Sequence, residues 1–455
     1  MTPLATEKGP ACRSGWQGRL WRRTWTANLT LTWMADFSVR AMNVTVKDAP
    51  PSGKAAVAGL VTLFAAAFLT ITTETLPMGL LPQMSDGIGA SQPMIGQLVS
   101  LYALVTLLVT LPLTAWTSHW PRRRLFVVIM VVFAVSNLLL AVSPNYATAA
   151  FARLIAAAVH GVLWSMMASY ATRLVPPDKA GRAVAAVFAG NSAALTLGVP
   201  LGTTVGTTFG WRVSFLGMGV IAVLVVVAAA TLLPRVEGVR AGRTGVGTAF
   251  RTPGVRGIVL TTTLIMLAHF AFYTYIAPYL ANRGIPEEGV SAVLFAFGGA
   301  GAVGVWAAGA LVDTRPRGAL LWAVGLVTAA MAGLAVIRDL PVATVVLAVV
   351  LGLAYAALPT LLQSAALKAA PAAQTAASSL FVLAFNLGIF AGAGLGGLFL
   401  EHIGVSALPV VAAVLAAAAT VVVIAGRRHS FPAASRNRDA GGDGTGERER
   451  ELAAH

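Results

Sequence analysis

The sequence predicts an all-α membrane protein of twelve transmembrane helices, arranged as two parallel six-helix repeats. Three observations carry this prediction. The mean hydropathy is +0.78 and only 11% of the residues are charged, against roughly 25% in soluble domains. Apolar runs of about 20 residues recur about twelve times, each long enough to cross a hydrocarbon core of roughly 30 Å. The second half of the chain also repeats landmarks of the first.

The internal repeat has a fixed offset. Moving along the chain by 195 residues pairs identical residues: Pro121 with Pro316, Arg122 with Arg317, Leu125 with Leu320, Asn191 with Asn386 and Gly202 with Gly397. Two parallel repeats of six spans are typical of transporters whose substrate site lies between the two halves. The repeat therefore indicates transport between two related bundles.

The spans are expected to be helices, because lipid offers no partner for an unpaired backbone group. They are predicted at 56–82, 95–117, 125–143, 147–173, 181–206, 213–233, 257–281, 290–312, 318–337, 341–367, 376–400 and 405–426. The N-terminal bundle is thus 56–233 and the C-terminal bundle 257–426, joined by a cytoplasmic linker at 234–256. Residues 1–55 are expected to be a disordered cytoplasmic extension or a basic, aromatic segment lying on the membrane. Residues 427–455 are expected to be a disordered cytoplasmic tail.

The net charge of +15 describes topology rather than a nucleic-acid surface. Basic residues gather in alternating loops, at 122–124, 173–182, 235–256, 315–317 and 368. The positive-inside rule then places both termini in the cytoplasm of a multi-pass cell-membrane protein. Cys12 is the only cysteine, which excludes an intrachain disulfide and a cysteine metal site. We expect no metal, no cofactor and no nucleic acid.

Four ionisable residues fall inside predicted spans, where each costs about 2.5–3.5 kcal/mol on insertion scales. They are Glu74, Arg153, His160 and His269. At 1.5 Å per residue, Glu74 and Arg153 are both expected roughly 9–12 Å below the outer surface. They can therefore face each other if their helices are neighbours.

Glu74 is the first candidate for proton coupling. Burial favours the protonated carboxyl and a nearby guanidinium favours the carboxylate, so a site that opens alternately to two sides can load and release a proton. The alternatives are a static ion pair with Arg153 and a contact with substrate alone. His269 occupies the repeat position of Glu74, and His160 is similarly deep. Each histidine could relay protons or hydrogen-bond a polar substrate, or be a neutral structural residue.

A substrate cavity is predicted from aromatic and polar residues on equivalent spans, namely Trp164, Tyr273, Tyr275, Tyr355 and Gln363. An apolar, aromatic lining with few polar groups suits amphipathic ligands better than a highly hydroxylated sugar. Ordinary packing and an interfacial aromatic belt are the alternatives.

Residues 56–426 resemble the major facilitator superfamily, and within it the twelve-helix drug:proton antiporter branch. The run Thr-Thr-Glu74-Thr-Leu-Pro-Met-Gly-Leu-Leu-Pro82 is similar to the first-helix motif of bacterial arabinose- and sugar-efflux and chloramphenicol-type exporters. The runs 160–165 and 273–278 are similar to the fourth and seventh helices of that group. Arg153 matches the fourth-helix arginine, which the resemblance implicates in proton transfer. The resemblance implies the major facilitator fold.

Two further motifs belong to the resemblance. Gly190, Gly198, Pro200 and Gly202 are similar to the fifth-helix antiporter motif, which implies export, although such glycines also serve close packing. The loop after the second span departs from the family pattern, because its acidic position is Ser118. Cytoplasmic gating is therefore expected from the residues Arg122, Arg123, Asp313, Arg315 and Arg317.

We therefore expect a secondary active exporter of a drug-like organic molecule, driven by proton antiport through alternating access. The chain is not expected to be an enzyme, and one chain is expected to function as a monomer. Efflux of a sugar or sugar derivative is the second reading, and proton-coupled uptake is the third. A polytopic membrane enzyme or sensor is the alternative from another class. No Gly-x-x-x-x-Gly-Lys-Ser/Thr phosphate loop occurs, so no ATP is implied.

Overall fold

The computed structural model describes residues 53–176, 179–234, 236, 250–252, 254–312, 314–337, 340–428 and 430–431. Within them, twelve helical segments are long and apolar enough to cross a membrane. In the first half these are α2 (Gly53–Gly79), α4 (Gln92–Thr117), α5 (Arg122–Ala141), α6 (Tyr146–Thr172), α7 (Ala180–Ala193) with η2 (Ala194–Gly198) and α8 (Val199–Phe209), and α9 (Trp211–Leu232). In the second half they are α11 (Val255–Tyr273), α13 (Glu287–Leu311), α14 (Pro316–Val336), α15 (Pro341–Ala369), α16 (Gln374–His402) and α17 (Leu408–Ala425). The predicted all-α, twelve-span fold is confirmed.

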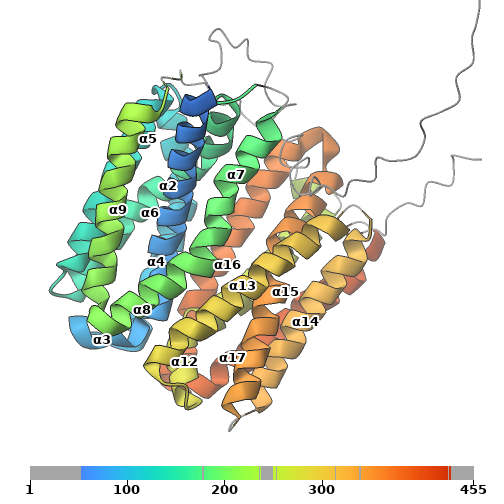
Figure 1. Ribbon diagram of the computed structural model, residues 1–455. Coiled ribbons are helices and arrows are strands. Elements are labelled where there is room, and N and C mark those ends of the chain that lie inside the picture. The colour runs from blue at the N-terminus through green and yellow to red at the C-terminus, as the bar shows by residue number, and fades with distance from the viewer. Residues whose placement is uncertain are drawn as a thin grey trace, which may run out of the picture.

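The internal repeat is visible in where the helices begin. The helices α3 (Leu81–Ile88), α4 and α6 have counterparts α12 (Ile276–Asn282), α13 and α15, each of which starts 195 residues later. The packing repeats as well. In the first half α4 packs on α6 and α5 on α9, and in the second half α13 packs on α15 and α14 on α17. The two halves lie side by side (Figure 1).

Proline breaks the first and seventh spans, which had been expected to run unbroken over 56–82 and 257–281. The first span ends at Gly79 and continues as α3, and the seventh ends at Tyr273 and continues as α12. Pro82 and Pro278 lie in the short helices, and proline has no N–H to donate and crowds the carbonyl four residues earlier. The repeat therefore extends to a bent end on the first helix of each half. We call the end of the bundle that carries α3 and α12 the α3/α12 end, and the opposite end the linker end.

The seam between the halves is formed by two symmetric helix pairs. Helix α4 packs along α16, and α13 packs along η2 and α8. Gly298 of α13 permits the second contact, because a Cβ there would meet the backbone of Leu195 and Thr196. The Thr196 hydroxyl donates to the Gly298 carbonyl at 3.1 Å. Small residues at crossings allow this close approach of backbones in membrane bundles.

Hydrogen bonds fasten the seam toward the α3/α12 end. The Ser100 hydroxyl, in the third turn of α4, donates to the Phe390 carbonyl of α16 at 2.7 Å. At the same end, the Gln83 amide of α3 donates to the Glu287 carboxylate, at the start of α13, at 2.8 Å. These bonds join the two halves directly. Contacts of this kind must break if the halves are to separate at this end.

Candidate proton and substrate site

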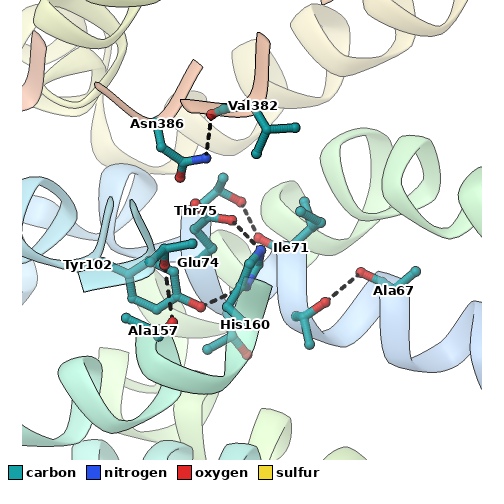
Figure 2. Close-up of polar contacts among 12 residues, drawn as sticks. Ala67, Ile71, Glu74, Thr75, Tyr102, Ala157, His160, Val382 and Asn386 are labelled. Atoms are coloured by element: carbon teal, nitrogen blue, oxygen red, sulfur yellow. Dashed lines mark hydrogen bonds and ion pairs between the residues drawn. The ribbon is translucent and has the colours of Figure 1, made fainter. Parts of the chain in front are cut away.

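A chain of three polar side chains lies inside the first half. Glu74 on α2 is 16% exposed, and its Oε2 lies 3.6 Å from Nε2 of His160 on α6. The other ring nitrogen of His160, Nδ1, shares a 2.8 Å hydrogen bond with the Tyr102 hydroxyl on α4. Figure 2 shows the imidazole between the carboxylate and the phenol. Three helices therefore meet at one titratable cluster.

Arg153 on α6 adjoins this cluster but bonds the backbone of α2 rather than the Glu74 carboxylate. The side chain is 1% exposed. Its guanidinium donates to the Thr73 carbonyl, and to the Glu74 carbonyl at 2.9 Å. Pro77 explains the first bond, because it has no N–H for the carbonyl four residues earlier. Arg153 thus satisfies an acceptor that the helix itself leaves free.

The Tyr102 ring completes the surroundings of Arg153. The guanidinium carbon lies 4.5 Å from the centre of the Tyr102 ring, within the range of a cation–π contact. Tyr102 therefore touches both Arg153 and His160. Sequence reasoning missed Tyr102, because one tyrosine in an apolar span carries no signal of its own.

A buried asparagine on α5, Asn137, is hydrogen-bonded to α2 beside this cluster. The Thr73 hydroxyl donates to Oδ1 of Asn137 at 3.2 Å, and the Asn137 amide donates to the Phe133 carbonyl at 2.8 Å. Buried polar groups that are satisfied in this way hold their neighbours in fixed positions. Asn137 was not predicted either, although an asparagine inside a span is a recognisable signal.

The second half holds an aromatic stack around His269. The imidazole lies parallel to the Tyr355 ring, with centroids 3.3 Å apart, and stacks on Tyr273 at 4.9 Å. The Phe297 ring lies 6.1 Å from His269. His269 is 2% exposed, and its Nδ1 is buried without a hydrogen-bond partner. The structure therefore brings together three residues predicted for proton coupling or the cavity.

The other predicted cavity residues lie in different places. Trp164 is half-buried on α6, with its ring 6.1 Å from that of His160. Gln363 lies two turns beyond Tyr355 on α15, and its amide donates to the Ser378 hydroxyl at 2.8 Å. Tyr275 is fully buried, and its hydroxyl donates to the Ala393 carbonyl of α16, within the second half, at 2.9 Å. Its ring also lies against Gly96 of α4, where an added Cβ would meet it. Tyr275 therefore packs at the seam and makes its hydrogen bond within its own half.

The glycines of the fifth span face α2. An added Cβ at Gly190 would meet the Phe64 carbonyl, and one at Gly202 would meet Leu76. Gly198 is the last residue of the π-helical turn η2 and lies two residues before Pro200. A proline crowds the preceding turn, and such π-helical turns often mark functional positions. The motif therefore sets the contact between α2, which carries Glu74, and the span that packs on the other half.

The predicted gating residues lie at the linker end. The backbone N–H of Arg122 donates to the Val236 carbonyl at 2.7 Å. The Arg317 guanidinium donates to the Phe431 carbonyl at 2.8 Å, and so binds the end of its own half. Arg123 is half-buried and Arg315 exposed. The fifth predicted gating residue, Asp313, lies outside the described residues, as do most of the two tails and the linker.

Among the described residues, no group of three or more His, Cys, Asp or Glu side chains is placed to hold a metal ion. The two sites consist of a carboxyl–imidazole–phenol chain in the first half and an aromatic stack in the second.

Comparison with known proteins identifies relatives of the whole bundle. The sequence model of the Major Facilitator Superfamily matches residues 63–377. A chloramphenicol efflux pump of Mycobacterium tuberculosis strain CDC 1551 / Oshkosh is 39% identical over 352 residues, which are 75% of this chain and 85% of the relative. The corresponding pump of strain ATCC 25618 / H37Rv is 38% identical over 352 residues, with the same coverage.

Solved structures share the fold. A bacterial homolog of the human lysosomal transporter Spinster, in an inward-facing and occupied conformation, superposes with a TM-score of 0.67 at 14% identity, covering 81% of this chain and 96% of that one. The inward-facing, unoccupied structure gives a TM-score of 0.61 at 16% identity, covering 84% and 97%. With the family match over most of the bundle and twelve apolar helices, the chain belongs to the Major Facilitator Superfamily and is a multi-pass membrane transporter.

Proposed function

We propose that the protein exports a small drug-like molecule in exchange for protons, by alternating access between its two halves. One observation carries the proton part. Glu74 is a partly exposed carboxyl inside the bundle, 3.6 Å from the ring of His160, and intramembrane carboxyl groups in transporters typically mark proton or substrate pathways. Similarity to the two mycobacterial pumps supports export and makes chloramphenicol the first substrate to test.

Glu74 takes the proton, and His160 and Arg153 set the conditions for its exchange. Burial favours a protonated carboxyl, and a nearby positive charge favours the carboxylate. A change in solvent access to Glu74 therefore changes which form is favoured. His160 connects the carboxyl to Tyr102, so it can pass on a proton or adjust its hydrogen bond as Glu74 changes charge.

The linker end is cytoplasmic in this proposal, and the α3/α12 end faces outward, as the positive-inside rule predicts. The bonds of Ser100 and Gln83 across the seam then close the outer side. Opening outward requires these contacts to break while the linker ends of the halves approach each other. The gating arginines Arg122, Arg123, Arg315 and Arg317 lie where that approach occurs. One chain contains both halves, so a monomer is sufficient.

The inward proton gradient supplies the energy. Each charge that crosses a potential of 100 mV contributes about 2.3 kcal/mol. A neutral substrate exchanged for one proton moves one net charge per cycle, so export responds to both the pH gradient and the membrane potential. A singly charged cationic substrate would respond only to the pH gradient.

Proteoliposomes that contain the purified protein and an internal pH dye test this proposal. Chloramphenicol, a cationic dye and a set of monosaccharides are added to vesicles in which a pH gradient is imposed. We expect proton movement opposite to the movement of chloramphenicol and none with the sugars. Proton movement with sugars alone would favour sugar export over drug export. If no compound causes proton movement, proton antiport is contradicted.

A further inference from the structure

The two sites described above occupy the same three positions of the internal repeat. The 195-residue offset pairs the residues of the polar chain with those of the stack: Glu74 with His269, Tyr102 with Phe297, and His160 with Tyr355. In each half the first and third members touch, at 3.6 Å between Glu74 and His160 and with ring centroids 3.3 Å apart for His269 and Tyr355. The same repeat positions thus form a contact in each half, with different chemistry.

The second copy has neither the carboxyl nor the guanidinium of the first. No carboxyl stands at its first position, and the residue equivalent to Arg153 is Ala348. In place of Glu74 and His160 are an imidazole and a phenol in face-to-face contact, flanked by the rings of Tyr273 and Phe297. Such a set of rings offers flat apolar surface, which aromatic ligands use through stacking.

One polar atom of the second copy is left without a partner. His269 Nδ1 is buried and makes no hydrogen bond. The Tyr355 hydroxyl has only the Met266 sulfur, at 3.3 Å, which is a weak acceptor. Buried polar atoms are almost always paired in folded proteins. A ligand group that bonds Nδ1 would therefore complete the site.

The stack also has an accessible side, because Tyr355 is partly exposed. Tyr355 lies on α15, the helix equivalent to α6 of the first half. In transporters built from two such repeats the substrate site lies between the repeats, so a molecule against the exposed side of Tyr355 would occupy that region.

We propose that the His269–Tyr355 stack is the substrate-recognition subsite, which binds a planar aromatic ring of an uncharged amphipathic compound and pairs His269 Nδ1 with a polar group of that compound. This inference rests on the proposed function and assigns its two tasks to different halves. The first copy handles the proton, and the second recognises the substrate. Of the two roles open to His269, a proton relay and a substrate contact, the structure assigns the second.

The test is equilibrium binding of radiolabelled chloramphenicol to purified protein in detergent, with displacement by an analogue that carries a cyclohexyl ring instead of the nitrophenyl ring. His269→Phe keeps a ring in the stack and removes the hydrogen bond, so binding should weaken about 10-fold. Tyr355→Leu should weaken chloramphenicol binding about 2- to 10-fold. The same change should reduce the preference for chloramphenicol over the cyclohexyl analogue.

Two controls test whether removal of an aromatic ring far from the stack affects binding. Trp322→Leu removes an aromatic ring that is 74% exposed on α14, and it should bind like the wild type. Trp306→Leu removes a ring that is 69% exposed on α13, and it should also bind like the wild type. Size-exclusion profiles and thermal unfolding identify any variant that does not fold, and for His269 the conservative variant His269→Tyr then repeats the measurement.

The outcomes distinguish the two proposals. Wild-type affinity in folded His269→Phe and Tyr355→Leu variants, with proton-coupled transport by the wild type, overturns the subsite and leaves the exporter proposal standing. Weakening of the same size in Trp322→Leu or Trp306→Leu would show that loss of any ring reduces binding, and it would also overturn the subsite. If the wild type neither binds nor transports any compound of the set, both proposals fail together.

Discussion

The link between Arg153 and Pro77 gives a quantitative prediction. Arg153→Lys keeps the buried charge, but an ammonium at the end of a shorter chain cannot match the fork that reaches the carbonyls of both Thr73 and Glu74. One charge-assisted hydrogen bond is therefore lost. Such a bond contributes about 1.5–3 kcal/mol, and we expect the free energy of unfolding to fall by that amount.

The proline determines how large this loss is. In Pro77→Ala the new N–H can bond the Thr73 carbonyl within α2, so that carbonyl no longer depends on Arg153. Arg153→Lys should then cost less in the Pro77→Ala background than in the wild type. The coupling energy between the two changes is expected to be about 1–2 kcal/mol, in the range of residues that share a partner.

A double-mutant cycle measures this coupling, with unfolding of the purified protein followed by circular dichroism as denaturing detergent is added. Pro112→Ala is the matched control, because Pro112 also lies inside a span, α4, without a described bond to Arg153. The Arg153 and Pro112 changes should be additive within about 0.3–0.5 kcal/mol. If the effects of Pro77→Ala and Arg153→Lys on the free energy of unfolding are equally additive, the explanation of why Arg153 bonds the backbone is refuted.

Three further substitutions test the gate and the proton site. Gln83→Ala removes the hydrogen bond to Glu287, which is worth about 0.5–1.5 kcal/mol, so the population open at the α3/α12 end should rise 2- to 10-fold. Spin labels on α3 and α12 measure this population. An unchanged distribution of distances between the labels would contradict the role of this bond in closing the α3/α12 end. Gly298→Val places a side chain against the backbone of the fifth span, so the folded variant should bind substrate but transport slowly, whereas wild-type transport would show that the close contact is dispensable. Tyr102→Phe removes the hydroxyl that bonds His160 and keeps the ring, so the pH dependence of transport should change; an identical pH profile would exclude the phenol from proton exchange.

The sequence was sufficient to predict the spans, because hydrophobic length and the 195-residue repeat are properties of the linear chain. Gln92 and Glu287 begin equivalent helices at the offset that the matching prolines indicate. The bends at the ends of the first and seventh spans were missed. The prolines were visible, but proline is often tolerated in membrane helices, so its presence alone does not place a break.

Site details were less predictable, because they depend on which atoms meet. The four ionisable residues were recognised from their cost in lipid, and the structure places Glu74, Arg153 and His160 around one point. Sequence alone could not show that Arg153 bonds carbonyl groups rather than the carboxylate. Nor could the sequence predict that Tyr275 lies at the seam and Tyr273 in the stack. The two residues are only two positions apart, but side chains two positions apart point in different directions from the helix.

Coupling at Glu74 is the central claim, and comparing two transport modes in Glu74→Gln tests it most directly. In counterflow, labelled chloramphenicol exchanges with unlabelled chloramphenicol across the vesicle membrane and needs no proton movement. In driven transport, an imposed pH gradient accumulates the drug. Asp86→Asn, at an exposed carboxyl on α3, is the matched control and should perform both.

We predict that Glu74→Gln keeps counterflow and loses driven accumulation, because the neutral side chain cannot exchange a proton. Accumulation at the wild-type rate in Glu74→Gln would contradict the account.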